Sequence, residues 1–215
     1  MRIVLLGPPA SGKGTQGRAI ASRLGLNDLS TGALLREAVE TRSDLGLVAE
    51  PILAHGGYLP DALMKPILAE WLERHDAKNG WVLDGFPRSL DQALFLDEWL
   101  GSRGKTIDIA ISLEASYAEL IERIRSRVEC LNCRWSGKTD ELRGEGTCPV
   151  CAGPATPRQD DTEENFRNRH AEFVAYTLPV IEFYRNKNQL LTLSATSPRE
   201  EVTEAILRYL KPMLG

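Results

Sequence analysis

Short apolar runs alternate along this chain with longer segments in which apolar residues recur every three or four positions. The runs that we expect to form buried parallel strands span residues 2–6, 81–83, 107–113 and 190–193, with a weaker candidate at 26–29. The helical stripes between them are formed by Leu63, Ile67, Trp71 and Leu72, by Leu120, Ile121, Ile124 and Val128, by Phe166, Phe173, Val174, Val180, Ile181 and Tyr184, and by Val202, Ile206, Tyr209 and Leu210. Strands that alternate with helices predict an α/β sandwich around a parallel sheet, and Pro179 predicts a kink in the third of these stripes.

Two segments depart from this alternation. Residues 128–161 contain no helical stripe and instead hold all four cysteines of the chain, together with several glycines and prolines. A second segment, residues 30–59, is mostly helical in pattern and ends at His55-Gly56-Gly57. We therefore expect one domain with two insertions, of which the cysteine-containing one needs a source of order other than an apolar core.

Length and composition narrow the class of protein. A chain of 215 residues with 42% hydrophobic and 26% charged residues suits one globular domain, and it excludes collagen-like, low-complexity and mainly disordered chains. No run approaches the ~18 apolar residues of a membrane span, and the first apolar run is too short for a signal peptide. We therefore expect a cytoplasmic protein without a membrane partner. The net charge of −4 argues against nucleic acid as a general partner.

The first predicted strand leads into a glycine-rich segment, GPPASGKGT at residues 7–15. It matches the G-x-x-x-x-G-K pattern of phosphate-binding loops, except that Gly14 stands where Ser or Thr is general and Thr15 follows one place later. Such a loop turns main-chain N–H groups towards an anion, and the following helix adds the positive end of its dipole. Lys13 would then neutralise charge near a transferred phosphoryl group. The alternative is an ordinary turn between a strand and a helix, which the position of Lys13 disfavours.

The apolar run at residues 81–83 is followed directly by Asp84. Behind a phosphate-binding loop, a carboxylate at the end of a strand is expected near the Mg²⁺ that accompanies nucleotide phosphates. Because Gly14 has no hydroxyl, we expect this metal to be held mainly through water. Close behind, Gly85 permits close approach of a ligand, and Arg88 offers a planar group that binds phosphate oxygens in pairs.

All four cysteines fall into two C-x-x-C pairs with fourteen residues between the pairs: Cys130, Cys133, Cys148 and Cys151. This spacing is typical of a four-thiolate Zn²⁺ site, and a site closed by four sulfurs is structural. Two disulfides are an alternative, but they would leave the pairs unlinked and are rare in reducing compartments. A zinc-ribbon module for nucleic acid is another, supported by Arg134 and Trp135 and opposed by the acidic residues around the cysteines.

Four ordered motifs together resemble adenylate kinase over essentially the whole chain. They are residues 7–15, the sequence STG at 30–32 followed by Arg36, DGFPR at 84–88 and RQDD at 158–161. The resemblance implies reversible transfer of the terminal phosphoryl group of Mg-ATP to AMP, which gives two ADP. It also implies a P-loop three-layer sandwich with a central parallel five-stranded sheet. A helical AMP-binding insertion at residues 30–59 and a small mobile zinc-binding lid at 122–161 would belong to this single kinase domain, residues 1–215.

The resemblance also places residue roles on the matching positions of this sequence. The residues that would hold ATP are Gly12, Lys13, Gly14, Thr15, Arg123 and Arg127. Those that would hold AMP are Thr31, Arg36, Leu59, Gly85, Arg88 and Gln92. The side chains expected to act on the transferred phosphoryl group are Lys13, Arg88, Arg123, Arg158 and Arg169. Asp84 would hold Mg²⁺ through water.

At several positions the chain departs from the pattern of the family. Ala10 and Arg134 stand where Gly is often found, Ala33 where Asp is usual, and Gly57 where some members have Lys. The resemblance implies that the carboxylate missing at residue 33 would lie near the water ligands of the metal. None of the departures replaces Lys13 or the arginines, so we expect activity to be retained.

Some alternatives stay open at the level of the sequence. A kinase for another nucleoside monophosphate, such as UMP or CMP, is disfavoured by Thr31 and Gln92, and a P-loop ATPase that docks through its zinc segment would not depend on AMP. Asp160 and Asp161 either take part in a metal site or cap or hinge the next helix. We expect a monomer, and we expect motion of the lid rather than phosphoryl transfer to limit turnover.

Overall fold

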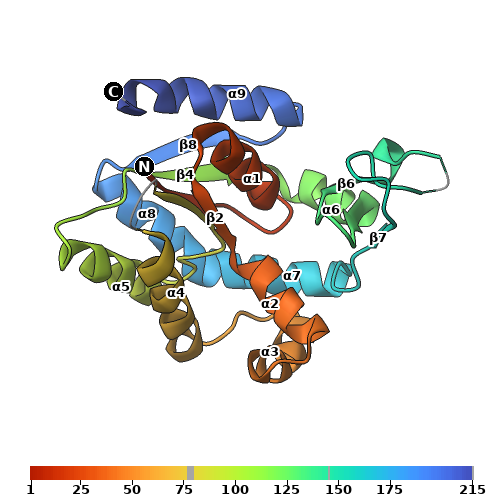
Figure 1. Cartoon of the computed structure of the whole chain (residues 1–215), viewed down its shortest axis with the longest axis horizontal. Coiled ribbons are helices and arrows are strands. Elements are labelled where there is room, and N and C mark those ends of the chain that lie inside the picture. The colour runs from red at the N-terminus through yellow and green to blue at the C-terminus, as the bar shows by residue number, and fades with distance from the viewer. Residues whose placement is uncertain (77–79, 145, 215) are drawn as a thin grey trace.

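The computed structural model describes residues 1–76, 80–144 and 146–214, and its centre is a five-stranded parallel sheet (Figure 1). The strands are β1 (Arg2–Leu6), β2 (Asn27–Ser30), β3 (Trp81–Asp84), β4 (Ile109–Glu114) and β8 (Leu190–Ser194). They lie in the order β2-β3-β1-β4-β8, and each neighbouring pair is parallel. The five strands predicted from apolar runs are confirmed, with ends that shift by one or two residues.

Helices cover both faces of the sheet and complete a three-layer sandwich (Figure 1). One face carries α1 (Lys13–Leu24) and α9 (Arg199–Leu210), which ends in the short helix η3 (Lys211–Leu214), and the other carries α4 (Asp61–His75), α5 (Leu90–Gly101) and α8 (Leu178–Asn186). Alternation along β1 separates the two apolar layers, since Ile3 and Leu5 pack under α1 and α9 while Val4 and Leu6 pack on the other side. The predicted sandwich is confirmed. Among the described residues, no helix has the length and apolar character needed to cross a bilayer.

Three residues that the sequence placed in buried helical stripes face solvent instead. Leu63, Val174 and Tyr209 are 41%, 47% and 45% exposed, so these positions of the prediction are wrong. The residues that α4 buries fully are Met64, Leu68 and Leu72. Because side chains four residues apart share a helix face, Leu63 lies beside this stripe rather than in it.

Residues 30–59 contain two helices, α2 (Thr31–Glu40) and α3 (Asp44–Ala54), that project from the core (Figure 1). They touch where α3 begins, because a Cβ on Gly46 would overlap the carbonyl oxygen of Ala38. Ser43 caps α3, and its hydroxyl accepts a hydrogen bond from the Gly46 N–H at 3.2 Å. Glycine at residue 46 thus lets the two backbones meet.

A small antiparallel sheet follows α6 (Tyr117–Ser126). Its strands are β5 (Arg127–Cys130), β6 (Ser136–Lys138) and β7 (Ala155–Pro157), in the order β6-β5-β7, with the 3₁₀ helix η1 (Thr139–Glu141) after β6. The prediction that Val128 continues a helical stripe is wrong, because the chain changes from helix to strand at Arg127. We call residues 127–161 the lid; in Figure 1 it projects from the core at the same end as α2 and α3.

The chain returns from the lid through α7 (Glu163–Glu172), which continues into α8 through the π-helical stretch η2 (Phe173–Thr177). Pro179 lies in the first turn of α8. Proline removes an N–H group from the helical ladder, and a π turn is one way to accommodate the loss. The structure therefore has a π turn just before Pro179, the residue at which the sequence predicts a kink.

Replacement of Gly46 by alanine tests the close contact between α2 and α3. We expect Gly46→Ala to lower the free energy of unfolding by about 1–3 kcal/mol, because the new methyl group forces the two helices apart. Urea unfolding followed by circular dichroism measures the change. The matched control is Gly101→Ala at the end of α5, where a Cβ meets no atom and a slight gain in stability is expected. Equal stability of the two variants would contradict the contact.

Candidate active site

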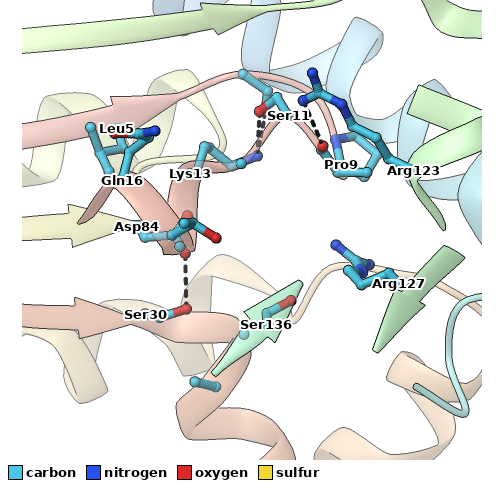
Figure 2. Close-up of a pocket in the computed structure, with 18 of the residues that line it drawn as sticks. Leu5, Pro9, Ser11, Lys13, Gln16, Ser30, Asp84, Arg123, Arg127 and Ser136 are labelled. Carbon is cyan, nitrogen blue, oxygen red and sulfur yellow. Dashed lines mark hydrogen bonds between the residues drawn. The ribbon is translucent and has the colours of Figure 1, made fainter. Parts of the chain in front are cut away.

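A cleft of about 1130 Å³ lies between the carboxyl ends of β1, β2 and β3, the helix α2 and the lid. Open parallel sheets bind ligands at this edge, where the strands end and loops lead into helices. Sites for one small molecule occupy ~300–1000 Å³, so this cleft has room for more than one. In Figure 2, Lys13 and Asp84 lie on one side of the space, and Arg127 points towards it from the lid.

Cations from many parts of the chain meet in this cleft. All seven that the sequence assigned to binding or transfer line it: Lys13, Arg36, Arg88, Arg123, Arg127, Arg158 and Arg169. Further cations that the sequence analysis did not single out also line it: Arg18, Lys138 and Arg199. These side chains come from α1, α2, the loop after β3, α6, the lid, α7 and α9, so folding collects charges that the sequence keeps apart.

Three of the residues predicted for AMP do not line the cleft but lie buried behind its wall: Thr31, Leu59 and Gln92. The Thr31 hydroxyl donates to the carbonyl oxygen of Gly85 at 3.0 Å. Gln92 accepts a hydrogen bond from the Arg88 N–H at 2.8 Å and donates to Asp61 at 2.6 Å. Two of these side chains thus hold the loop from Gly85 to Arg88, both of which do line the cleft.

The glycine-rich loop links β1 to α1 and forms one wall of the cleft. Gly7 has a φ of 139°, and a Cβ there would lie 2.5 Å from the carbonyl oxygen of Leu113, so the loop passes β4 closely. Gly12 precedes α1 without a capping side chain, which leaves the first N–H groups of the helix and its positive dipole end for an anion. Ala10 has a φ of 64°, a backbone conformation that favours glycine.

Lys13 is folded back onto this loop. Its ammonium group donates to the carbonyl oxygens of Gly7 at 2.8 Å and Pro8 at 2.7 Å. Burial lowers the pKa of Lys13 to about 8, Asp84 acts in the opposite direction, and Arg88 adds to the lowering. The positive charge of Lys13 is therefore costly in the free protein, and a phosphate group would stabilise it.

Asp84 lies at the end of β3, level with Ser30 at the end of β2. The Ser30 hydroxyl donates to the Asp84 carboxylate at 2.9 Å, as the dashed line in Figure 2 shows. A Cβ on Gly14 would lie 3.1 Å from the same carboxylate, so glycine at this place of the loop keeps the carboxylate accessible. A carboxylate and a hydroxyl beside a phosphate-binding loop are oxygen donors that suit Mg²⁺ and its water ligands.

The lid and α7 bring two arginines to one acid. Asp160 accepts from Arg169 at 2.6 Å and lies 3.3 Å from the Nε of Arg158. Burial opposes ionisation of Asp160, but the two guanidinium groups hold its pKa well below the usual range. Asp160 therefore stays ionised and keeps Arg158 and Arg169 side by side.

Asp161 has a separate partner, since both of its carboxylate oxygens bind Arg127. Neither of the two acids caps α7. Instead, Thr162 caps this helix, because its hydroxyl accepts a hydrogen bond from the Asn165 N–H at 3.1 Å. The capping alternative for Asp160 and Asp161 is therefore wrong.

Glu129 and Tyr58 line the cleft but were not predicted as site residues. Glu129 is 8% exposed, and its carboxylate lies 3.4 Å from Arg158 and 3.9 Å from the Nε of Arg36. Tyr58 places its ring 4.2 Å below the guanidinium of Arg88. No motif spacing signals either residue, because both act through segments remote in the sequence.

Within the part of the chain that the structure describes, Arg36 lacks a hydrogen-bond partner for one of its buried atoms. Its Nε is buried and has no hydrogen-bond partner among the described residues. Burial, followed by repulsion from Arg158, lowers the pKa of Arg36 to about 10, although Glu129 opposes the change. An anion in the cleft would supply the missing acceptor.

The four cysteines form the second candidate centre, in the lid. All four sulfur atoms lie within 4.8 Å of one another. Two of the separations between the pairs are 3.5 Å, from Cys130 to Cys151, and 3.6 Å, from Cys133 to Cys148. Zn–S bonds of ~2.3 Å in a tetrahedron place sulfurs ~3.8 Å apart, so the cluster fits Zn²⁺. The cysteines are free thiols, and the disulfide alternative is wrong.

The two C-x-x-C segments have the same local structure. The N–H of Arg134 donates to the carbonyl of Cys130 at 3.0 Å, and that of Ala152 donates to the carbonyl of Cys148 at 3.0 Å. Arg134 and Ala152 both have positive φ, 58° and 57°. The Cys133 N–H is the main cause that lowers the pKa of Cys130. The Trp135 N–H acts to lower the pKa of Cys133, but burial and the neighbouring sulfurs outweigh it and raise that pKa.

The lowered pKa of Lys13 predicts how nucleotide affinity depends on pH. Below pH 8 Lys13 is charged both free and bound, so its contribution is constant. Between pH 8 and its ordinary pKa of 10.5 the free enzyme loses this proton and binding of a phosphate restores it. We expect affinity for a non-hydrolysable ATP analogue to fall up to tenfold per pH unit in this window, with proton uptake seen by calorimetry in two buffers. Lys13→Arg should abolish the uptake; uptake that persists would exclude Lys13 as its source.

Removal of zinc tests the role of the cysteines. A ligand at a thousand times its dissociation constant stabilises a fold by about 4 kcal/mol. For a chain of this length that corresponds to ~8–16 °C in the midpoint of thermal unfolding. We expect release of one Zn²⁺ per chain on thiol modification, and a fall of this size for Cys148→Ser or for the chelated protein, measured by calorimetry. Protein purified without metal and equally stable would contradict a structural site.

Comparison with known proteins agrees with this geometry. The family model for adenylate kinase matches residues 5–189. The chain is 39% identical to the adenylate kinase of Thermosipho africanus over 98% of its own length and all of that protein. It is 39% identical to that of Streptomyces avermitilis and 37% identical to that of Clostridium perfringens, with at least 97% of each chain covered. The chain therefore belongs to the adenylate kinase family.

Proposed function

We propose that the cleft binds ATP along the glycine-rich loop and AMP along α2 and the loop after β3. The reaction of the family is reversible phosphoryl transfer from ATP to AMP, which gives two ADP. The observation that supports these places is the convergence of the seven predicted cations on a cleft with room for more than one nucleotide. Two nucleotides bring many phosphate charges together, and cations from both sides reduce their repulsion.

On the ATP side, the first N–H groups of α1 and Lys13 would bind the phosphates, and Gly12, Gly14 and Thr15 line that wall. Arg127 and Arg123 would close over them from β5 and α6; Arg123 also donates to the carbonyl oxygen of Ala10 at 3.4 Å. The family uses Mg²⁺ with ATP, and this metal supplies charge neutralisation between phosphates when bound. Asp84 would hold it through water, with Ser30 fixing the carboxylate.

On the AMP side, Arg36 and Arg88 would bind the acceptor phosphate. The unpartnered Nε of Arg36 points to such a role, and the stacking of Arg88 on Tyr58 orients its guanidinium group. Gly85 would allow the nucleotide to approach the loop, while Thr31, Leu59 and Gln92 would shape the pocket from behind its wall. The helices α2 and α3 thus form the AMP-binding insertion in this proposal.

The transfer itself needs positioning and charge rather than a base. The acceptor phosphate is already anionic near neutral pH, so no proton has to be removed from it. Arg158, Arg169 and Lys13 would stabilise the transferred group, since they line the cleft from the lid, α7 and α1. The lid would exclude water, which otherwise hydrolyses ATP, and its opening would limit turnover.

We also propose that the chain acts as a monomer in the cytoplasm. The four cysteines are free and gathered at one candidate metal site, a state that a reducing compartment maintains. Acidic groups interleave with the cations of the cleft, among them Glu37, Glu129 and Asp160, which does not favour a nucleic-acid backbone as partner.

A coupled assay of ADP formation tests the proposal. We expect ADP to form from ATP only when AMP is added, and more slowly with UMP, CMP or GMP. Lys13→Met should lower kcat by ~10²–10³-fold, because it removes one preorganised donor of the transfer site. Arg36→Ala should raise KM for AMP by ~10–150-fold, the equivalent of ~1.5–3 kcal/mol for a charged hydrogen bond, and leave KM for ATP within twofold. ADP release that ignores AMP would overturn the proposal in favour of an ATPase.

A further inference from the structure

The π turn between α7 and α8 aligns two residues with the cleft. Arg169 and Thr177 are eight residues apart, which in a regular α-helix is ~2.2 turns and would turn their side chains ~80° away from each other. The π stretch uses an additional residue, since the Leu178 N–H reaches back to the carbonyl of Phe173, five residues earlier. One extra residue reduces the difference to ~20°. Both Arg169 and Thr177 accordingly line the cleft.

Thr177 uses this orientation to contact Arg88. Its hydroxyl donates a hydrogen bond to the main-chain carbonyl oxygen of Arg88 at 2.9 Å, and the residue is 4% exposed. The N–H of the same residue, Arg88, is held by Gln92 at 2.8 Å. One nearby side chain, Gln92, and one remote side chain, Thr177, therefore fix both polar groups of the Arg88 main chain.

The guanidinium end of Arg88 is fixed as well. Its Nε donates to the carbonyl oxygen of Gly85 at 2.8 Å, and its plane stacks on Tyr58. Arg88 follows β3 in a loop outside the strand ladder, so these contacts set its position. Of the segments involved, the one that contains Thr177 also carries Arg169, which binds Asp160 of the lid.

We propose that Thr177 is a positioning residue, which ties Arg88 to the continuous α7–η2–α8 helix and so keeps Arg88 in register with Arg169. This inference rests on the proposed role of Arg88 in binding and transfer. A displacement of ~1 Å at a group that aligns reacting phosphates costs up to ~10²-fold in rate. The π turn then has a use in catalysis, because without it the hydroxyl of Thr177 would point away from Arg88.

The variants Thr177→Val and Thr177→Ser separate this role from packing. Valine keeps the shape of threonine but removes the hydroxyl, which leaves the partly buried Arg88 carbonyl without this donor. We expect Thr177→Val to lower kcat about tenfold and to raise KM for AMP three- to tenfold, with KM for ATP within twofold. Thr177→Ser keeps the hydroxyl and should return both values to within threefold of the parent enzyme.

The matched control is Thr203→Val. Thr203 is 1% exposed, and its hydroxyl also hydrogen-bonds inside the fold, to Gln16 at 2.7 Å and to the carbonyl of Arg199 at 3.0 Å. Loss of the Thr203 hydroxyl in Thr203→Val should lower thermal stability and leave KM for AMP unchanged. If Thr203→Val raised KM for AMP as much as Thr177→Val, the effect would be one of general stability, and the inference would be wrong.

A double-mutant cycle with Arg88→Ala completes the test, with ADP formation measured at saturating ATP. Because Thr177 acts through Arg88, Thr177→Val should change AMP kinetics less than twofold in the Arg88→Ala background. A full additive loss there, or a Thr177→Val enzyme with parental kcat and KM, overturns the inference. If Arg88→Ala alone leaves AMP kinetics unchanged, the proposed role of Arg88 itself is wrong. This result distinguishes a failure of the proposed function from a failure of the inference about Thr177.

Discussion

Repulsion among like charges is the constraint on which this structure depends. Several arginines and a partly buried lysine share one cleft, and the cost is visible in the lowered pKa values of Lys13 and Arg36. The protein offsets this cost with its own carboxylates, since Asp160 lies between two arginines and Glu129 lies between Arg158 and Arg36. Phosphate groups that enter the cleft meet cations already gathered, so binding does not have to assemble them.

The fold collects these charges by two different means. The parallel sheet brings the loop before α1, the start of α2 and the loop after β3 to one edge, because all its strands end there. Among its described residues the lid has no apolar core of comparable size, and a four-sulfur site takes the place of one. Cys130 is the last residue of β5, so a metal there also fixes Glu129 and Arg127 on the same strand. The strand β5 thus links the metal site that orders the lid to two of the charged side chains in the cleft.

The sequence was sufficient wherever a residue acts through its neighbours in the chain. The five strands, the glycine-rich loop with Lys13 and the grouped cysteines are encoded by apolar runs and fixed spacings, and the structure confirms them. It was insufficient where a role arises between remote segments. Glu129 and Thr177 carry no motif, yet they contact arginines on other elements. Helical stripes failed at Leu63 and at other edges of a buried face, because neighbouring helices decide which residues a helix finally covers.

Arg134 makes one of the contacts between the lid and the core. Its backbone has a φ of 58°, which costs a residue other than glycine ~1–2 kcal/mol. Its guanidinium binds both carboxylate oxygens of Glu40 at the end of α2, at 3.1 and 2.5 Å, and its carbonyl accepts from Arg18 of α1. The Arg134–Glu40 ion pair is largely open to solvent, and exposed ion pairs contribute ~0.2–1 kcal/mol to stability. The contact therefore offsets at most the strain that accompanies it. Other contacts also join the lid to the core, such as those of Arg199 with Ser136 and Glu141 and of Arg169 with Asp160. Phosphates bound between the lid and the core would add to these contacts and shift the lid further towards closure.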